Sequence, residues 1–449
     1  MKISTIILAA GQGTRMVSAL PKVLHKLNGR ELVRYSIETA RSVGSDKPVL
    51  IVSPNAELIR ATVGEQALYA VQEKQLGTAN AVMAAQPLLE GKADLVLVIN
   101  ADMPLLTAST LAALIETQKS NPGPLTMAII ISDNPRGFGR VIRSGDGKVQ
   151  RIVEEAQATH EQLKIHELNV GAYCFSGAWL WNALKEIKLS PRGEYYLTDI
   201  VEIAGKAGES IASITLDDED EAMGINNRKH LAEAEAVMHR RINEKWMLAG
   251  VTMLDPNLVY IEEGVKIGRD TLLMPNTYLR GNVQVGEGCR IGPNTIIENS
   301  SIGNNCSLLA SVIEGAIVED GVSMGPFCHL RKGAHLRKGV HMGNFGEVKD
   351  STLGPGTKMG HFSYIGNAEI GENVNIGAGT ITCNFDGVHK NPTVIGDDVF
   401  IGSDTMLVAP VKIGKGAKTG AGAVVREDVA DGDVVVGVPA HSIRKKKQT

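Results

Sequence analysis

Aromatic residues are scarce in this sequence: they make up 4% of its 449 residues, whereas glycine occurs 49 times. So little bulky apolar volume argues against a second large globular core and favours a regular solenoid beside one globular body. No run of about 18 apolar residues occurs, so nothing predicts a membrane span or a membrane partner. The formal net charge of −4 likewise gives no reason to expect nucleic acid as a partner.

Cysteine is also rare, and none of the five cysteines lies in a CxxC or Cys/His pattern. They are Cys174, Cys289, Cys306, Cys328 and Cys383. We therefore expect reduced packing residues in a cytoplasmic protein rather than a disulfide framework. Met1 and Lys2 lead directly into a strand-like run without a small-residue cleavage site, so no signal peptide is expected.

A six-residue repeat dominates residues 267–425. Ile-Gly or a close variant recurs there, mostly at spacings of six or near multiples of six, as at Ile267-Gly268, Ile291-Gly292, Ile370-Gly371, Ile376-Gly377 and Ile413-Gly414. Such a period predicts a solenoid in which aliphatic side chains point inward and Gly, Asn and Asp make the turns. With three hexads to a coil, residues about 18 apart stack at one strand spacing, roughly 4.7 Å.

The first 225 or so residues have a different pattern, in which short β-branched runs alternate with helical periods. We expect strands at residues 3–8, 48–52 and 95–99 and helices at residues 30–43 and 108–119. This alternation is typical of an α/β sheet, in which ligands bind beyond the carboxyl ends of parallel strands.

The loop after the first expected strand reads Leu8-Ala9-Ala10-Gly11-Gln12-Gly13-Thr14-Arg15-Met16 and is followed by Pro21-Lys22. Its glycines let backbone N–H groups approach a phosphate chain, and Arg15 and Lys22 can neutralise the phosphate charge. The alternative is a tight strand-to-helix turn that carries surface basic residues.

Two further stretches lie at positions suited to a nucleotide. Asp102 follows the strand at 95–99; it can cap a helix, but opposite a phosphate loop it is better placed to hold Mg²⁺. Gln72, Gln75 and Thr78 offer amides and a hydroxyl that can read the edge of a pyrimidine, unless they form an idle surface cluster.

This succession of motifs resembles the sugar-1-phosphate nucleotidyltransferases, which join a nucleoside triphosphate to a sugar phosphate. The resemblance implies a Rossmann-like domain with catalytic roles for Arg15 and Lys22, and Mg²⁺ held by Asp102 and Asn226, with Asn227 as the adjacent alternative. The implied nucleotide and sugar contacts are Leu8, Ala9, Ala10, Gly11, Lys22, Gln72, Gly77, Thr78, Gly139, Glu154, Asn169 and Asn226. The sequence departs from the common pattern at Gln12, Asn100-Ala101 and Ala156.

Residues 227–249 have one apolar stripe at helical spacing, and Gly250 is placed to end the helix. A helix of this length spans about 35 Å. It either holds two bodies apart, each with its own site, or is a plain packing helix.

Register counting in the repeat predicts which side chains are neighbours. Met324, Met342 and Met359 mark one corner of three consecutive coils, and Arg331 and Lys349 each lie seven positions after a marker. They should stack about 5 Å apart, where repulsion of order 1–3 kcal/mol favours a bound anion. We interpret the pair as a phosphate site; the alternative is two long side chains that splay into water.

The same counting places His361 between Asn344 and Ala378, and Glu347 beside Tyr364. A carboxylate near an imidazole can orient it and raise its basicity for proton abstraction. A lone histidine in a repeat is otherwise a structural residue.

Residues 360–366 (Gly-His-Phe-Ser-Tyr-Ile-Gly) and 375–384 (Asn-Ile-Gly-Ala-Gly-Thr-Ile-Thr-Cys-Asn) resemble the bacterial bifunctional enzymes of UDP-N-acetylglucosamine synthesis. These enzymes fuse an N-acetylglucosamine-1-phosphate uridylyltransferase to a glucosamine-1-phosphate N-acetyltransferase. The resemblance implies a left-handed parallel β-helix, a homotrimer formed through it, and acetyl-CoA bound between adjacent helices. It also implies four segments: a nucleotidyltransferase domain at 1–226, a helix at 227–249, an acetyltransferase β-helix at 250–436 and a basic tail at 437–449.

Carried over by position, His361 is the base that takes a proton from the sugar amine. The implied amino-sugar contacts are Arg331, Lys349, Tyr364, Asn375, Asn384 and Lys390, and the implied acetyl-CoA contacts are Ala378, Ser403 and Ala421. Phe385 stands where tyrosine is common. The chain ending also departs from the family, which leaves Arg426, Arg444 and Lys445 as candidates for the coenzyme diphosphate.

Two other readings stay open at this point. The chain could be a sugar nucleotidyltransferase whose β-helix only trimerises or binds a regulatory ligand, or its β-helix could acylate a different amino sugar. The intact set Arg331, Lys349, His361, Tyr364 and Lys390 favours the bifunctional reading. Preference for UTP over dTTP is not encoded in any motif.

Overall fold

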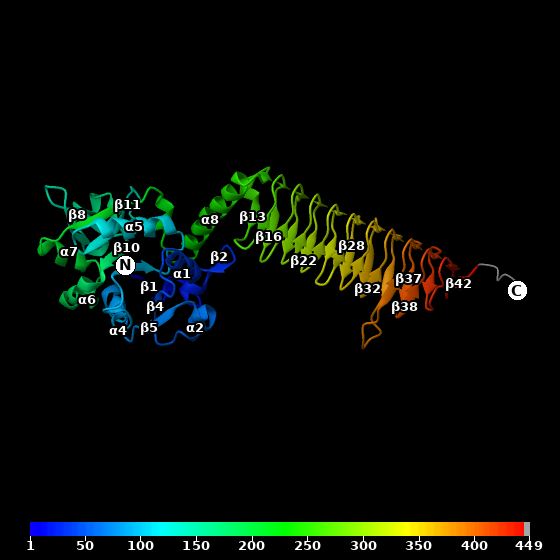
Figure 1. Ribbon diagram of the computed structural model, residues 1–449, viewed down its shortest axis with the longest axis horizontal. Helices are drawn as coiled ribbons and strands as arrows, with labels where there is room; N and C mark the ends of the chain where they lie inside the picture. Colours follow the sequence, from blue (N-terminus) through cyan, green and yellow to red (C-terminus); the bar gives the residue numbers. More distant parts are fainter. Residues whose placement is uncertain (444–449) are drawn as a thin grey trace. The chain divides into compact units, whose positions relative to one another are not determined.

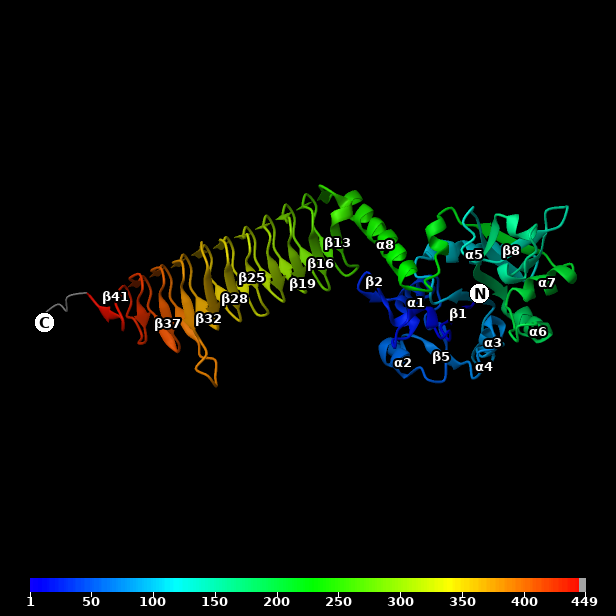
Figure 2. The same ribbon diagram turned by 180° about the vertical axis from the view of Figure 1, so that it is seen from behind.

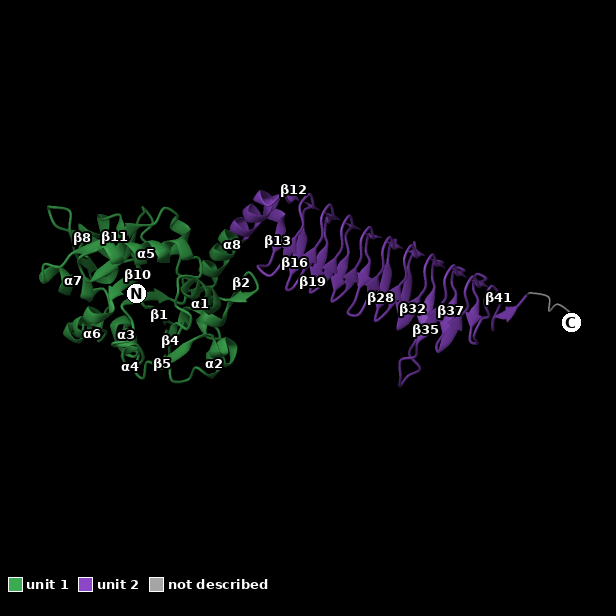
Figure 3. Ribbon diagram, viewed as in Figure 1, with its two compact units in different colours: residues 1–238 green, residues 239–449 purple. Residues whose placement is uncertain are grey.

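The computed structural model describes residues 1–443, so Arg444, Lys445 and most of the expected basic tail lie outside the described residues. The chain divides into two compact units, Met1–Met238 (unit 1) and His239–Thr449 (unit 2) (Figure 3). The boundary falls inside helix α8 (Arg228–Leu248), which contributes residues to both units.

Unit 1 is an α/β structure built on one mixed sheet with the order β11-β7-β10-β6-β1-β4-β5. Its strands are β1 (Ile3–Leu8), β4 (Val49–Val52), β5 (Leu68–Val71), β6 (Leu95–Asn100), β7 (Leu125–Ile131), β10 (Glu167–Ser176) and β11 (Ile211–Thr215), with the small pair β8 (Arg140–Arg143) and β9 (Val149–Val153) attached to β10. Because β1, β4, β5 and β6 are mutually parallel, their carboxyl ends share one edge of the sheet.

Helices cover the sheet of unit 1 (Figure 1). They are α1 (Leu32–Ser42), α2 (Glu57–Val63), α3 (Thr78–Met83), α4 (Gln86–Leu89), α5 (Ala108–Ser120), α6 (Gly177–Glu186) and α7 (Asp199–Lys206). The sheet is buried on both faces, because Ile7 and Leu97 belong to one core cluster while Ile6 and Val98 belong to another. This explains why the central strands read as continuous apolar runs.

The first helix begins two residues later than the sequence pattern predicts. Residues 30–31 form β3 (Arg30–Glu31), which pairs with β2 (Lys26–Leu27) in a hairpin. Asn28 and Gly29 make the turn with positive φ angles of 46° and 81°. An Asn-Gly pair in this conformation is the preferred two-residue hairpin turn, so local turn chemistry prevails over the helical period.

Unit 2 is a β-helix whose coils each place a strand on successive faces (Figures 1 and 2). Within residues 1–443 its strands form a 12-stranded, a 10-stranded and a 9-stranded sheet, all with parallel neighbours except the last pair, β41 and β42. Inward side chains such as Leu279, Ile313 and Val348 are fully buried. Each coil therefore buries the apolar row of the next one.

The 12-stranded sheet comprises β12 (Thr252–Met253), β15 (Leu272–Leu273), β18 (Arg290–Ile291), β21 (Ser307–Leu308), β24 (Ser323–Met324), β27 (His341–Met342), β30 (Lys358–Met359), β33 (Asn375–Ile376), β36 (Phe400–Ile401), β39 (Lys418–Thr419), β41 (Val434–Val436) and β42 (His441–Ser442). The 10-stranded sheet comprises β13 (Val259–Ile261), β16 (Thr277–Arg280), β19 (Ile296–Glu298), β22 (Val312–Glu314), β25 (His329–Leu330), β28 (Gly346–Lys349), β31 (Ser363–Gly366), β34 (Ile381–Cys383), β37 (Met406–Val408) and β40 (Val424–Val425). The 9-stranded sheet comprises β14 (Lys266–Ile267), β17 (Gln284–Val285), β20 (Ser301–Ile302), β23 (Ile317–Val318), β26 (His335–Leu336), β29 (Thr352–Leu353), β32 (Ala368–Ile370), β35 (Thr393–Ile395) and β38 (Val411–Ile413).

The glycine of the repeat is needed where one coil passes close to the next. A Cβ atom at Gly343 would lie 1.8 Å from the backbone oxygen of Gly360, which no side chain tolerates.

The repeat is interrupted between β34 and β35, and the intervening loop protrudes from the coils (Figure 1). Within residues 1–443, no helix has the length and apolar character that a membrane crossing requires.

Candidate functional site

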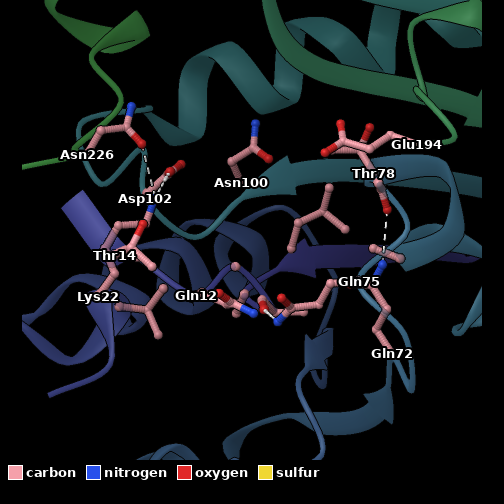
Figure 4. Close-up of a pocket in the computed structure, with 18 of the residues that line it drawn as sticks. Gln12, Thr14, Lys22, Gln72, Gln75, Thr78, Asn100, Asp102, Glu194 and Asn226 are labelled. Atoms are coloured by element: carbon pink, nitrogen blue, oxygen red, sulfur yellow. Dashed lines mark hydrogen bonds and ion pairs between the residues drawn. The ribbon is translucent and has the colours of Figure 1, made fainter. Parts of the chain in front are cut away.

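A cavity of about 620 Å³ opens in unit 1 beside the ends of β1 and β6 (Figure 4). Most of the sequence-predicted residues line it: Leu8, Ala9, Ala10, Gly11, Gln12, Arg15, Lys22, Gln72, Gln75, Gly77, Thr78, Asn100, Asp102 and Asn226. Lys22, Asp102 and Asn226 lie at one end, and Gln72, Gln75 and Thr78 at the other (Figure 4). The sheet thus gathers residues that are up to about two hundred positions apart in sequence.

The loop after β1 brings two cations together. Arg15 lies on the 3₁₀ helix η1 (Thr14–Met16), and Lys22 begins the 3₁₀ helix η2 (Lys22–Leu24). Gly13 precedes η1 with a φ of 62°, and a Cβ atom there would lie 2.6 Å from the Cβ of Lys22. Glycine is therefore required for the close approach of the two 3₁₀ helices.

Cations and oxygen ligands converge at this end of the cavity. The ammonium of Lys22 forms an ion pair with the carboxylate of Asp102 and donates to Oδ1 of Asn226 at 3.2 Å. Arg15 donates to the same Oδ1 at 3.0 Å. Two oxygens already directed at one cation form a donor set that suits Mg²⁺, which takes few protein oxygens and completes its shell with water and phosphate.

Asn226, and not its neighbour, faces the cavity. The backbone N–H of Ile225 donates to the carbonyl of Asp102 at 2.8 Å, which fixes the adjacent Asn226 beside the aspartate. Asn227 instead accepts a hydrogen bond from the backbone N–H of His230 at 2.9 Å, at the start of α8. Asn227, the alternative magnesium ligand suggested by the sequence, therefore has a local structural role.

At the other end of the cavity, the predicted base-reading side chains are held by hydrogen bonds to their own segment and to two distant ones. Nε2 of Gln72 donates to the Gly77 carbonyl at 3.0 Å, and Nε2 of Gln75 donates to the Ala10 carbonyl at 2.5 Å. The hydroxyl of Thr78 accepts from the backbone N–H of Leu197 at 3.0 Å. These contacts fix the side chains before a ligand binds.

Two cavity residues, Glu194 and Tyr196, were missed by the sequence analysis. Tyr195, which lies between them, is bound through its backbone to Leu76 at 2.7 Å and to Ala79 at 2.9 Å. Burial, and then the neighbouring Glu194, raises the pKa of the Tyr196 hydroxyl. The only available signal was the polar and aromatic string at residues 193–196 in a chain poor in aromatics.

The predicted sugar-binding residues Gly139, Glu154 and Asn169 lie outside the lining of this cavity. Asn169 is buried, accepts from the hydroxyl of Tyr173 at 3.0 Å and donates its backbone N–H to the Gly139 carbonyl at 2.9 Å. Glu154 accepts from the hydroxyl of Thr198 at 2.7 Å. Asn169 and Gly139 are thus bound to each other, whereas Glu154 is bound to a different partner.

Of the departures from the common family pattern, Gln12 and Asn100 line the cavity. The amide of Asn100 makes two long contacts, with the Gly171 carbonyl at 3.5 Å and with the sulfur of Met103 at 3.8 Å. Ala101 is fully buried and donates its backbone N–H to Leu8 at 3.0 Å. Ala156 is exposed and does not contribute to the lining.

In unit 2, the register places Arg331 and Lys349 side by side, as the sequence predicts. Leu330 pairs with Val348, and the backbone N–H of Arg331 donates to the Val348 carbonyl at 2.9 Å. Lys390 on the protruding loop, and then Arg331, lowers the pKa of Lys349. Three cations therefore gather on this surface.

Tyr364 and Asn384 lie next to these cations. Lys349 pairs in register with Gly366. A Cβ atom at Gly366 would lie 2.4 Å from the Tyr364 hydroxyl and 3.0 Å from the Asn384 amide nitrogen. Asn384 itself is buried and donates to Asn367 at 2.7 Å. Within a single chain, Asn375 does not lie beside Tyr364 and Asn384, because it is on β33, which belongs to a different sheet.

The expected contact between Glu347 and His361 is absent from the described residues. Glu347 pairs with Tyr364 in register, as predicted, but its carboxylate accepts from Arg331 at 3.0 Å. A guanidinium in reach forms the stronger, charge-assisted bond. His361 is exposed at the bend that precedes β31, five residues before Gly366.

The predicted acetyl-CoA residues form one column at the corner that carries His361. The carbonyls of Phe362, Ala378 and Ser403 accept from Gly379 at 2.7 Å, Asp404 at 2.6 Å and Gly422 at 2.8 Å, respectively. Ala378, Ser403 and Ala421 are therefore successive members of this corner, and all have small side chains. Arg426 is exposed just beyond β40.

Comparison with known families matches residues 4–247 to the nucleotidyl transferase family. Residues 264–299 and 392–427 match the bacterial transferase hexapeptide (six repeats) family. The protein named bifunctional protein GlmU of Heliobacterium modesticaldum is 44% identical over 436 residues, which cover 97% of this chain and 95% of that protein. The protein of the same name from Carboxydothermus hydrogenoformans is 46% identical over 427 residues, covering 95% of each chain. The GlmU protein of an Exiguobacterium species is 42% identical over 450 residues, covering 100% of this chain and 98% of that protein. The chain therefore belongs to the GlmU family of bifunctional enzymes, with a nucleotidyltransferase unit ahead of a left-handed hexapeptide-repeat β-helix.

Proposed function

We propose that this bifunctional enzyme of UDP-N-acetylglucosamine synthesis divides its two reactions between its two units. Unit 2 transfers acetyl from acetyl-CoA to glucosamine-1-phosphate. Unit 1 then joins N-acetylglucosamine-1-phosphate to UTP and releases pyrophosphate. The observation that carries the proposal is the convergence of Lys22 and Arg15 with Asp102 and Asn226 in the cavity of unit 1.

In the uridylyl reaction, an oxygen of the sugar phosphate attacks the α-phosphorus of UTP, and the bond to pyrophosphate breaks. Arg15 and Lys22 act by neutralising phosphate charge, and no covalent enzyme intermediate is needed. Because the ammonium of Lys22 contacts Asp102 here, it turns from the carboxylate to the phosphates when UTP binds.

We assign Asp102 and Asn226 as the protein ligands of Mg²⁺. A bound Mg²⁺ supplies Lewis-acid stabilisation of the charge on the transferring phosphoryl group. The ammonium that now bridges the two oxygens supports the assignment, because it marks a position where a cation is stabilised. Gly139, Glu154 and Asn169 are proposed as sugar contacts and Gln72, Gly77 and Thr78 as uracil contacts.

In the acetyl reaction, the amine of glucosamine-1-phosphate attacks the thioester carbonyl while His361 takes its proton, and the thiol of coenzyme A leaves. Arg331, Lys349 and Lys390 bind the phosphate, with Tyr364, Asn375 and Asn384 as further sugar contacts. Lys349 supports this role, because Lys390 and then Arg331 lower its pKa, and the opposing effect of Asp350 does not cancel theirs. Ala378, Ser403 and Ala421 are proposed to contact acetyl-CoA.

The proposal includes a homotrimer formed through the β-helix, with acetyl-CoA between neighbouring copies. The rings of Phe327 and Phe345 stack at 5.3 Å yet are 61% and 60% exposed. Exposed aromatic pairs of this kind mark surfaces that another molecule covers.

We place the enzyme in the cytoplasm, which is supported by the free state of all five cysteines.

Two assays test the proposal. Thiol release from acetyl-CoA is measured with glucosamine-1-phosphate and with other amino-sugar phosphates, and pyrophosphate release is measured with N-acetylglucosamine-1-phosphate and UTP or dTTP. We expect both reactions, with UTP preferred. Thiol release without sugar discrimination would instead indicate a different amino sugar as acceptor, and no thiol release would leave the β-helix a purely trimerising or regulatory role.

A further inference from the structure

His25 comes three residues after Lys22, outside the lining of the cavity, and has no part in the mechanism described above. It follows η2, and its side chain is 5% exposed. Its backbone N–H donates to the Lys22 carbonyl at 3.2 Å, and its own carbonyl accepts from Leu32 at 3.0 Å. The position of its ring is therefore tied to the backbone of Lys22 on one side and to the start of α1 on the other.

The imidazole of His25 accepts a hydrogen bond from an arginine. Nδ1 lies 3.2 Å from Nη1 of Arg228, and because a guanidinium can only donate, Nδ1 is the acceptor and Nε2 carries the proton. Burial, and then the charge of Arg228, lowers the pKa of His25, while the Leu20 carbonyl acts in the opposite sense. The ring is thus a neutral acceptor at ordinary pH.

Arg228 is the first residue of α8 and comes two positions after Asn226. The segment between them is already bound to the aspartate, through the hydrogen bond from Ile225 to the Asp102 carbonyl. One buried imidazole therefore joins the segment that carries Lys22 to the segment that carries Asn226. The same two segments also meet through the bond from Lys22 to Asn226 at 3.2 Å and through the bond from the Asn28 N–H to Glu235 of α8 at 2.9 Å.

We propose that His25 is a positioning residue for uridylyl transfer. Its bond to Arg228 holds Asn226 at the distance from Lys22 at which the Asn226 and Asp102 oxygens can bind a divalent cation while Lys22 reaches the phosphates. The inference rests on the proposed uridylyl function of unit 1. If His25 only filled space, any apolar replacement of similar volume would leave metal binding intact.

Three variants separate positioning from packing. His25→Leu removes the acceptor but keeps a buried side chain, His25→Asn retains an oxygen at the δ position, and Arg228→Met removes the donor at an exposed site. The readout is Mn²⁺ binding in the presence of UTP, measured as free Mn²⁺ by electron paramagnetic resonance, together with the kcat of pyrophosphate release.

We expect His25→Leu and Arg228→Met each to weaken Mn²⁺ binding and lower kcat by about 10- to 100-fold, the range for groups that orient metal ligands. His25→Asn should recover most of the loss. The double variant His25→Leu/Arg228→Met should be no worse than either single variant, because both remove the same bond.

Far-UV circular dichroism reports whether the helices of unit 1 remain folded in each variant, and thiol release from acetyl-CoA reports that unit 2, to which neither residue belongs, is intact. If His25→Leu fails to fold, Arg228→Met alone decides the question. Unchanged Mn²⁺ binding in Arg228→Met, additive losses in the double variant, or no recovery in a folded His25→Asn overturns the proposal. Wild-type protein that neither binds Mn²⁺ nor releases pyrophosphate would overturn the proposed function itself.

Discussion

In unit 1 the cations Arg15 and Lys22 contact the oxygens of Asp102 and Asn226 inside a cavity, whereas in unit 2 Arg331, Lys349 and Lys390 gather on an exposed surface. In the first cluster both cations contact oxygens of the chain, so in the proposed uridylyl reaction Lys22 must leave Asp102 to reach a phosphate. Within residues 1–443, the second cluster forms ion pairs from Arg331 to Glu347 at 3.0 Å and from Lys390 to Asp350 at 4.0 Å, and Glu314 also acts on Arg331. One site therefore pre-positions opposite charges, and the other concentrates like charges for an anion.

The largest expected effect comes from removing the base proposed for unit 2. His361→Ala should lower thiol release by about 10²- to 10⁴-fold, the contribution typical of a general base. Pyrophosphate release should stay at the wild-type rate, because the two clusters share no residue. A folded variant that loses both reactions would refute the division of labour between the units.

Removing the carboxylate of unit 1 should produce the reverse pattern. Asp102→Ala takes away the one charged ligand proposed for Mg²⁺, and a loss of several kcal/mol corresponds to about 100- to 1000-fold in pyrophosphate release. Asp146, which is exposed and far from the cavity lining, serves as a matched control when replaced by alanine. Equal losses in the two variants would rule out a specific role for Asp102.

A smaller effect should follow from removing one positive charge from the cation cluster of unit 2. Lys349→Met should raise the KM for glucosamine-1-phosphate by about tenfold, as expected for one charge-assisted phosphate contact. The kcat should change less, because Lys349 does not touch the reacting amine. A change confined to kcat would show that Lys349 does not bind the phosphate.

The same cluster predicts a pH dependence. Since Lys390 and Arg331 lower the pKa of Lys349, this lysine loses its charge at a lower pH than the ordinary value of about 10.4. The KM for glucosamine-1-phosphate should therefore rise as pH increases through that lowered pKa. Initial rates over an alkaline pH series check this, and Lys349→Met should show a flatter profile.

The smallest expected effect is a gain. Gln12 lines the cavity at a position where lysine is common in the family, so Gln12→Lys adds a cation beside the phosphate loop. The KM for UTP should fall by about three- to fivefold, equivalent to roughly 1 kcal/mol, while the KM for the sugar phosphate stays constant. An increase in the KM for UTP would indicate that Gln12 makes a contact that lysine cannot replace.

Register arithmetic predicted neighbours in unit 2 well, because hydrogen-bonded coils fix which residues lie opposite one another. The pairing of Glu347 with Tyr364 is confirmed. Counting does not give side-chain direction, so it missed the Glu347–Arg331 bond. In unit 1, the loop residues and Asp102 were recognisable because each follows a strand. Glu194 was not, since tertiary hydrogen bonds of Tyr195 bring it to the cavity.

The glycine corners of unit 2 constrain how this protein can change over evolutionary time. At Gly343 any side chain collides with the next coil, so a single insertion or substitution at such a corner is blocked. A complete coil, by contrast, can be gained or lost without disturbing the contacts that remain. Length variation among related chains should therefore come in whole coils, and it should spare the coils from Arg331 to Ala421, in which the columns of the acetyltransferase site must keep their order.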